Sequence, residues 1–235
     1  MTHSQPQLSV PAPRYLGSKR GAGVYQAIIS QFPPHDLYIE PFLGTGAIMR
    51  LKPPAPHSIG IDLLPYCIDS YVHAAGESLE LICGDGMATI AKYRYGGSRT
   101  LIYCDPPYLL STRTSKNRYV HDFTEADHIR LLQALRASTC SIAISGYPSQ
   151  LYDDWLSPWR TVTFQAMTRG GVRTEKLWMN YPAIPHWHTY AGRNFTDRQR
   201  IKRKAARWGA DFKRIPPGER LAILAVLLAK IDNDN

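Results

Sequence analysis

Four consecutive residues, Asp105-Pro106-Pro107-Tyr108, combine groups suited to chemistry on an exocyclic amine. The Asp105 carboxylate and the Pro106 carbonyl can each accept a hydrogen bond from one amine hydrogen. This draws the nitrogen toward a pyramidal geometry and directs its lone pair at an electrophilic methyl group. The two prolines stiffen the backbone and fix the direction of the carbonyl, and Tyr108 offers an aromatic face to an extruded base. The same residues also suit a plain turn after a strand, so their position in the fold matters.

A glycine-containing segment, Glu40 to Gly46 (EPFLGTG), follows the first apolar run. Its glycines allow the backbone to approach a cofactor closely and to turn into a helix. The third glycine of the dinucleotide-binding pattern is missing. Asp62 ends the second run, where a carboxylate can accept hydrogen bonds from both ribose hydroxyls, and Asp85 ends the third, where it could contact a cofactor's adenine amine. Each acid alone suits an exposed loop, but acids ending three successive runs indicate one site.

Short apolar runs alternate with helix-like stretches through most of the chain. The runs lie at 37–40, 58–61, 79–83, 101–104 and 141–144. The clearest helical pattern runs from Thr124, a candidate N-cap, to Arg136 with Ile129 on its apolar face, and a short helix is expected over 18–31. This α/β alternation predicts a parallel sheet with helices on both faces and a ligand site beyond the carboxyl ends of its strands. Strands at 161–167 and 175–180 would form a hairpin.

The chain has 235 residues and a net charge of +9, from 28 Lys and Arg against 19 Asp and Glu. That length fits one α/β domain, and that charge favours a polyanionic partner, with nucleic acid first. The four cysteines form no CxxC pair, so we expect no metal site and read them as buried free thiols. The polar N-terminus lacks a signal sequence, and the run Leu221 to Ala229 is too short to cross a bilayer. We therefore expect a soluble, cytoplasmic protein without a membrane partner.

Basic residues gather in two segments outside the strand ends. One is the loop after Tyr108, and the other is a helical C-terminal extension, residues 182–235, which follows a flexible N-terminus (1–13) and a catalytic domain (14–181). The residues expected to contact DNA phosphates are Arg113, Lys116, Arg118, Arg200, Arg203, Lys204 and Arg207. Basic residues interleaved with aromatics suit phosphate contact and stacking. The alternative is a solvated basic helix packed through Ile201, Ala205 and Trp208.

The order of these motifs resembles the Dam-type (D12 class) DNA adenine-N6 methyltransferases. The resemblance rests on RYLGSK at 14–19, EPFLGTG, the acid after the second strand, YCDPPY at 103–108 and EKLWMNY at 175–181. It implies a Rossmann-like methyltransferase fold with seven strands and a late antiparallel strand, S-adenosylmethionine as cofactor, and duplex DNA with a flipped adenine as partner. It also implies catalytic roles for Asp105, Pro106, Pro107 and Tyr108. The cofactor-binding residues that it implies are Tyr15, Lys19, Glu40, Phe42, Gly44, Gly46, Asp62, Asp85 and Asp105.

The sequence departs from this family in one respect. The segment between Asp85 and Leu101 is too short for the helical recognition insert that family members usually carry. We therefore expect a short or relaxed sequence preference, and a monomer that could dimerise on DNA. Two alternatives stay open: an RNA methyltransferase acting on guanine N2 of ribosomal RNA, and a nucleic-acid-binding protein on an inactive methyltransferase scaffold. No dedicated base is required for amine methylation, and we expect His128 to face solvent or cap its helix.

Overall fold

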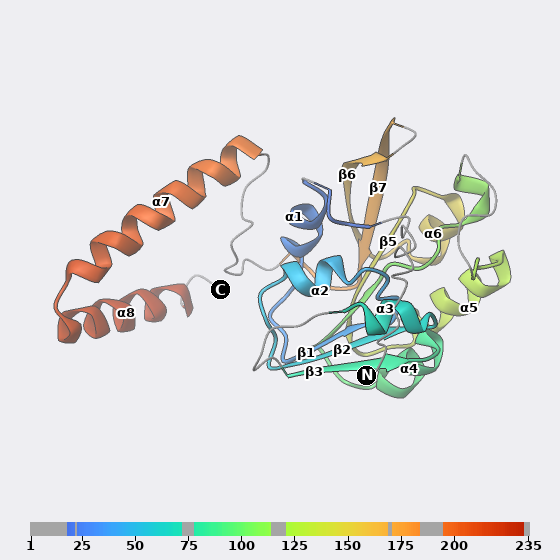
Figure 1. The fold of residues 1–235 in the computed structure, drawn as a ribbon, viewed down its shortest axis with the longest axis horizontal. Coiled ribbons are helices and arrows are strands. Elements are labelled where there is room, and N and C mark those ends of the chain that lie inside the picture. Colours follow the sequence, from blue (N-terminus) through green and yellow to red (C-terminus); the bar gives the residue numbers. More distant parts are fainter. Residues whose placement is uncertain are drawn as a thin grey trace, which may run out of the picture. The chain divides into compact units, whose positions relative to one another are not determined.

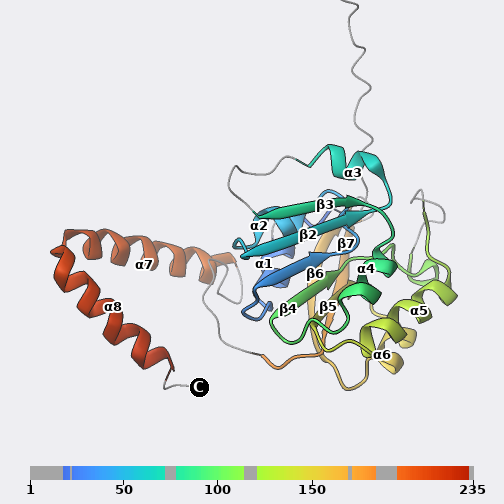
Figure 2. The ribbon, with the colours of Figure 1, turned by 90° about the horizontal axis from the view of Figure 1, so that it is seen from below.

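The computed structural model describes residues 18–21, 23–71, 78–113, 121–168, 171–183 and 195–232. The chain forms two compact units, residues 1–186 and 187–235. The first unit is built around a single sheet (Figure 1, Figure 2). Within the described ranges, no helix has the length and apolar character that a membrane span requires.

Seven strands form the sheet in the order β3-β2-β1-β4-β5-β7-β6. The strands are β1 (Leu37–Glu40), β2 (His57–Asp62), β3 (Leu79–Cys83), β4 (Thr100–Cys104), β5 (Ser141–Gly146), β6 (Arg160–Thr168) and β7 (Gly171–Met179). The strands from β1 to β5 pair in parallel, whereas β7 is antiparallel to β5 and forms the expected hairpin with β6. The seven strands and the late antiparallel strand confirm the Rossmann-like methyltransferase fold expected from the sequence.

The helices of this unit lie on both faces of the sheet, with α1 and α2 on one face and α4 on the other (Figure 1, Figure 2). Their bounds are α1 (Val24–Ile29), α2 (Ala47–Leu51), α3 (Pro65–Asp69), α4 (Gly86–Tyr93), α5 (Glu125–Arg136) and α6 (Gln150–Trp155), with a 3₁₀ turn η1 (Leu110–Thr112). Thr124 caps α5 as expected, in a capping box with Asp127. The helix expected over 18–31 is shorter, because Gly23 adopts φ 93° immediately before Val24.

The core lies around the central strands, because β4 and β5 are buried at every position. Strands covered on both faces become continuous apolar runs, which is why these segments lack a polar alternation. The helix α5 contributes Leu131, Leu132 and Leu135 to this core. The buried face of α5 also includes His128, while Ile129 is only partly buried. The expectation that His128 faces solvent was therefore wrong.

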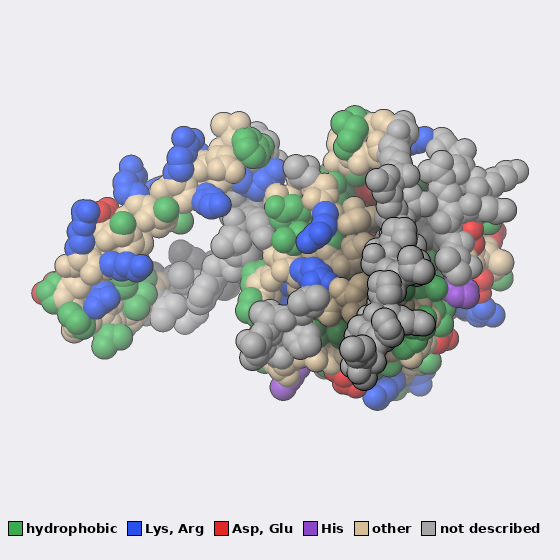
Figure 3. All heavy atoms as spheres, viewed as in Figure 1, with side chains coloured by type: hydrophobic (Ala, Val, Ile, Leu, Met, Phe, Trp, Pro, Cys, Tyr) green, Lys and Arg blue, Asp and Glu red, His purple; other side chains and the backbone are tan. Residues whose placement is uncertain are grey.

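The described part of the second unit, residues 195–232, forms the helices α7 (Phe195–Arg214) and α8 (Pro217–Asp232). No residue of α7 is buried, and Lys and Arg side chains line it (Figure 3). They are Arg198, Arg200, Lys202, Arg203, Lys204, Arg207, Lys213 and Arg214. Trp208 is 61% exposed and carries the Lys204 ammonium 5.2 Å from its ring centroid. Of the three packing residues in the alternative, Ile201 is half-buried, whereas Ala205 and Trp208 are exposed. Contact of this helix with DNA stays a prediction.

Candidate active site

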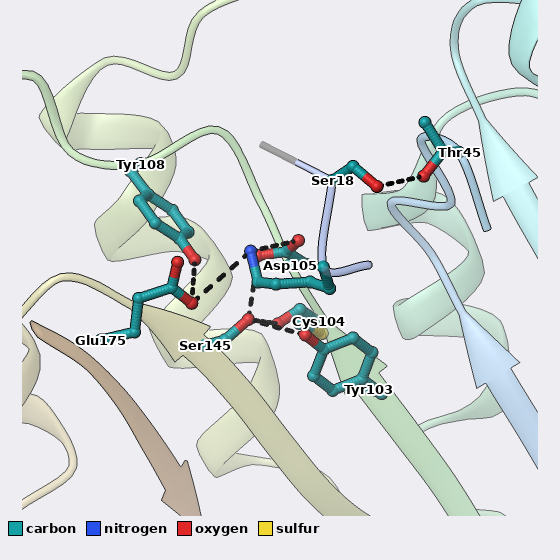
Figure 4. A network of polar contacts seen from close by, with 9 residues as sticks. Ser18, Thr45, Tyr103, Cys104, Asp105, Tyr108, Ser145 and Glu175 are labelled. Atoms are coloured by element: carbon teal, nitrogen blue, oxygen red, sulfur yellow. Dashed lines mark hydrogen bonds and ion pairs between the residues drawn. The ribbon is translucent and has the colours of Figure 1, made fainter. Parts of the chain in front are cut away.

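The strand ends bring the motif residues together at one edge of the sheet, as the parallel pairing requires. Asp105 follows β4 directly, and Ser145 lies near the end of the neighbouring strand β5. Glu175 joins them from β7 (Figure 4), and Lys19 joins from the segment before α1. Four segments that are distant in sequence thus supply one polar cluster.

The Asp105 carboxylate is held from two sides. Its Oδ2 lies 2.8 Å from Lys19 Nζ, and its Oδ1 accepts a hydrogen bond of 2.9 Å from Ser145 Oγ. Tyr103 Oη is 2.9 Å from the same Ser145 hydroxyl, so a buried pair of hydroxyl groups holds the Oδ1 side of the carboxylate. The Asp105 side chain is 18% exposed. Its direction is therefore fixed, while part of it stays accessible.

Tyr108 lies beside this carboxylate with its hydroxyl turned inward. Its Oη donates a hydrogen bond of 3.1 Å to Glu175 Oε2, and the Tyr147 ring meets the Tyr108 ring edge-on at a centroid distance of 4.7 Å. Lys19 Nζ lies 4.8 Å from the Tyr108 ring centroid. Its ring is thus positioned by contacts on several sides.

The glycine loop after β1 is tied to the end of β2 by Asp62. The Gly44 amide donates to Asp62 Oδ2 at 2.8 Å, and the Leu64 amide donates to Oδ1 at 2.9 Å. The Cys67 thiol also hydrogen-bonds to this carboxylate. Gly46 has φ 62°, and a Cβ there would lie 2.3 Å from the Tyr71 ring. A side chain is therefore excluded at this position.

Asp85, which follows the end of β3, also caps the helix α4. Its side chain accepts a hydrogen bond of 2.8 Å from the Met87 amide and caps α4. The next residue, Gly86, packs against the glycine loop so closely that a Cβ would lie 2.1 Å from the Pro41 carbonyl oxygen. This contact fixes the beginning of α4 against the loop.

Glu40, the last residue of β1, is a buried acid beside this loop. Tyr38 Oη donates a hydrogen bond of 2.9 Å to its Oε2. Burial, together with the nearby Asp105 charge, raises the pKa of Glu40 to about 8. Glu40 is therefore protonated at neutral pH.

Other sequence-based site residues are placed differently or lie outside the described ranges. The Arg113 side chain is 8% exposed and pairs with Asp122 at 2.7 Å, so it is not at the surface where a phosphate contact was expected. Phe42 packs edge-on against Phe123, with ring centroids 5.6 Å apart. Tyr15, Lys116 and Arg118 lie outside the described residues.

The structure corrects the expected burial of one cysteine and adds one acid to the predicted site. Cys83 is exposed rather than buried, because β3 is an edge strand, whereas the other three cysteines are buried thiols. Glu175 was not recognised as a site residue. A signal was present, since an acid in a strand that continues as an apolar run is rarely buried without a partner. Among the described residues, no group of three His, Cys, Asp or Glu side chains is arranged to hold a metal ion.

No family model matches this chain, and no curated protein matches it. Solved structures with a similar fold include an rRNA methylase of Streptococcus thermophilus, with 12% identity over 69% of this chain and 97% of that one at a TM-score of 0.45. Another is magnesium protoporphyrin IX methyltransferase of Synechocystis with bound S-adenosylmethionine. It is 14% identical over 66% of this chain and 74% of that one, at a TM-score of 0.41. A third is a Pyrococcus abyssi tRNA (uracil-54, C5)-methyltransferase. It is 11% identical over 66% of this chain and 36% of that one, at a TM-score of 0.42.

Proposed function

We propose that this protein transfers a methyl group from S-adenosylmethionine to the exocyclic N6 of adenine in DNA. The observation that carries the proposal is the Asp105 carboxylate, which is held in one direction at the end of β4 with Tyr108 beside it. A carboxylate fixed in this way suits a primary amine, whose two hydrogens need two acceptors. The Pro106 carbonyl is the second acceptor in the proposal.

The proposed reaction needs positioning more than acid–base catalysis. Hydrogen bonds to Asp105 and Pro106 would localise the N6 lone pair, and the Tyr108 ring would stack on a base turned out of the helix. The methylated amine can lose its proton to water, so no dedicated base is required. His128 does not compete for that role, since burial lowers its pKa to about 4 and its Nδ1 is engaged with Tyr152 Oη at 2.9 Å.

The glycine loop and the strand-end acids fit the cofactor. S-adenosylmethionine supplies an electrophilic methyl on a sulfonium. Asp62 would bind the ribose hydroxyls, and Asp85 would contact the adenine amine. Glu40 would bind the ammonium of the methionine moiety. Gly44 would allow a ligand to approach the backbone, and Phe42 would contact that ligand. At Gly46 the Tyr71 ring fills the space beside the backbone, so this glycine serves the packing of the loop.

The basic helix α7 is the proposed DNA contact of the second unit. Arg203, Lys204 and Arg207 are exposed, whereas Arg200 pairs with Asp197 at 2.9 Å. Exposed cations bind the phosphates of nucleic acid without distinguishing its base sequence. Together with the short segment between β3 and β4, this supports a short or relaxed recognition sequence.

The test compares the wild type with Asp105→Ala and Asp105→Asn on methyl-free DNA and on RNA, using tritiated cofactor and mass spectrometry of the digested nucleosides. We expect N6-methyladenine in DNA from the wild type and none from either variant, with cofactor binding largely retained. Retention of activity by the alanine variant would refute the role of Asp105. Labelled N2-methylguanine in RNA would instead support the RNA enzyme, which also uses an exocyclic amine.

A further inference from the structure

Glu175 is a buried acid on β7 that contacts two residues of the proposed active site (Figure 4). Its Oε2 accepts the Tyr108 hydroxyl at 3.1 Å and lies 3.7 Å from Lys19 Nζ. The side chains of Glu175 and Lys19 are only 7% and 6% exposed. Burial raises the pKa of Glu175, and the Lys19 ammonium acts in the opposite direction. The cluster is thus one ammonium shared between two carboxylates, with the shorter contact to Asp105.

Lys19 lies where the proposed reaction needs the base to bind. Its ammonium is 2.8 Å from Asp105 Oδ2, an oxygen suited to an amine hydrogen, and 4.8 Å from the centroid of the Tyr108 ring, on which the base would stack. An ammonium and a base amine are both donors, so they compete for the same carboxylate. The base therefore has to displace Lys19 from Asp105 before the amine can be oriented.

Displacement of a buried ammonium is costly unless another anion receives it. Glu175 Oε2 is already close to Lys19 Nζ, so a small movement of the lysine side chain would exchange one carboxylate for the other. Such a movement keeps the ammonium paired and frees Asp105. It also keeps the ammonium beside the oxygen that fixes the Tyr108 hydroxyl.

We propose that Glu175 is a positioning residue that receives the Lys19 ammonium when the target base binds Asp105, and that it thereby opens the base site. The inference rests on the proposed function for its substrate, because the entering group is taken to be a base amine. Glu175 acts through Lys19 and does not touch the reacting atoms.

The decisive substitution is Glu175→Gln. Glutamine keeps the length of the side chain and an oxygen acceptor for Tyr108, but it has no charge with which to receive the ammonium. Lys19 then stays on Asp105 and competes with the base. We expect kcat/KM for DNA to fall by about tenfold or more, with an unchanged KM for S-adenosylmethionine. Tyr108→Phe removes the hydroxyl contact alone and separates that contribution, and Glu80→Gln, on the exposed edge strand β3, is the matched control.

The double variant Lys19→Met/Glu175→Gln separates this role from a merely structural one. If Glu175 works by receiving the ammonium, then removal of the ammonium relieves the defect at saturating S-adenosylmethionine, and the double variant is then more active on DNA than Glu175→Gln alone. A purely structural role gives additive losses. A double variant that is no more active than Glu175→Gln would overturn the proposal.

Thermal unfolding of the wild type, Lys19→Met, Glu175→Gln and the double variant tests the inference independently of activity. In the wild type, Lys19→Met leaves the buried Glu175 and the partly exposed Asp105 without their shared cation, whereas in the Glu175→Gln background it leaves only Asp105 without it. We therefore expect Lys19→Met to lower the Tm more in the wild type than in the Glu175→Gln background. Equal shifts would contradict the shared ion pair. A wild type without activity on DNA, combined with unequal shifts, would refute the proposed function while leaving the shared ion pair supported.

Discussion

Glu40→Gln tests the electrostatics of the site without any assumption about the substrate. Glu40 is buried, and burial raises its pKa from 4.5 to about 8. Between these pH values the folded protein holds a proton that the unfolded chain has released. The free energy of unfolding of the wild type therefore falls as the pH rises through this window. Glutamine has the size of the protonated acid and does not titrate, so the variant lacks this dependence.

The expected magnitude follows from the linkage relation. One proton corresponds to about 1.4 kcal/mol per pH unit, so between pH 5.5 and 7.5 the wild type should lose about 3 kcal/mol more than Glu40→Gln. The slope depends only on the pH window lying between the two pKa values. The charge of Asp105 contributes to the raised pKa of Glu40, because a negative charge nearby disfavours ionisation of a second carboxyl group.

The assay is urea unfolding of the wild type and Glu40→Gln at half-unit pH steps, with Glu80→Gln as the control. We expect the stability difference between the wild type and Glu40→Gln to change linearly with pH, while the control follows the wild type. Parallel curves for the wild type and Glu40→Gln would refute the raised pKa. Calorimetry adds a functional readout, since binding of the cofactor ammonium at Glu40 should release a proton, and the apparent enthalpy should then vary with the buffer at pH 7.

Three further outcomes are expected. Acid should destabilise the protein through His128: burial lowers its pKa from 6.5 to about 4, so the unfolded chain takes up the proton first, and stability falls by about 3 kcal/mol between pH 6.5 and 4. An acid unfolding series that is no steeper for the wild type than for His128→Gln would contradict this. Gly86→Ala should cost roughly 1–3 kcal/mol, because its Cβ would meet a carbonyl oxygen 2.1 Å away; an unchanged chemical denaturation midpoint would exclude the close approach. Replacement of Arg203, Lys204 and Arg207 by alanine should weaken DNA binding and reduce its salt slope by roughly 3, and an unchanged slope would remove α7 from the DNA interface.

Local patterns in the sequence predicted most of the fold. The apolar runs at 101–104 and 141–144 became β4 and β5, because continuous apolar segments of that length form strands buried on both faces. Parallel pairing then places the carboxyl ends of β1 to β5 at one edge, which is why Asp62 and Asp105 could be assigned to a common site from their positions alone. The Thr124 cap and the hairpin were equally local features, and both were predicted, although the second strand begins at Gly171 and not at the predicted Glu175.

Contacts between distant segments could not be predicted in this way. The sequence indicates that Asp105 follows a strand, but only the antiparallel register of β7 brings Glu175 to Tyr108, across 67 positions. His128 illustrates the same limit. The helical pattern allows a histidine on the buried face or on the exposed face of α5, and packing against Tyr152 decided that His128 is buried.

The ionisation of the site is likewise a property of the tertiary structure. Glu40 was recognisable as an acid beside a glycine loop, yet its proton depends on its burial and on the Asp105 charge contributed by another strand. Arg113 looked like a surface cation until the fold paired it with Asp122. The sequence determined that Asp62, Asp85 and Asp105 reach one edge of the sheet, since each lies at or just after the carboxyl end of a parallel strand. The tertiary structure decided which of them are charged and which contact one another, because both depend on desolvation and on distances between segments that are far apart along the chain.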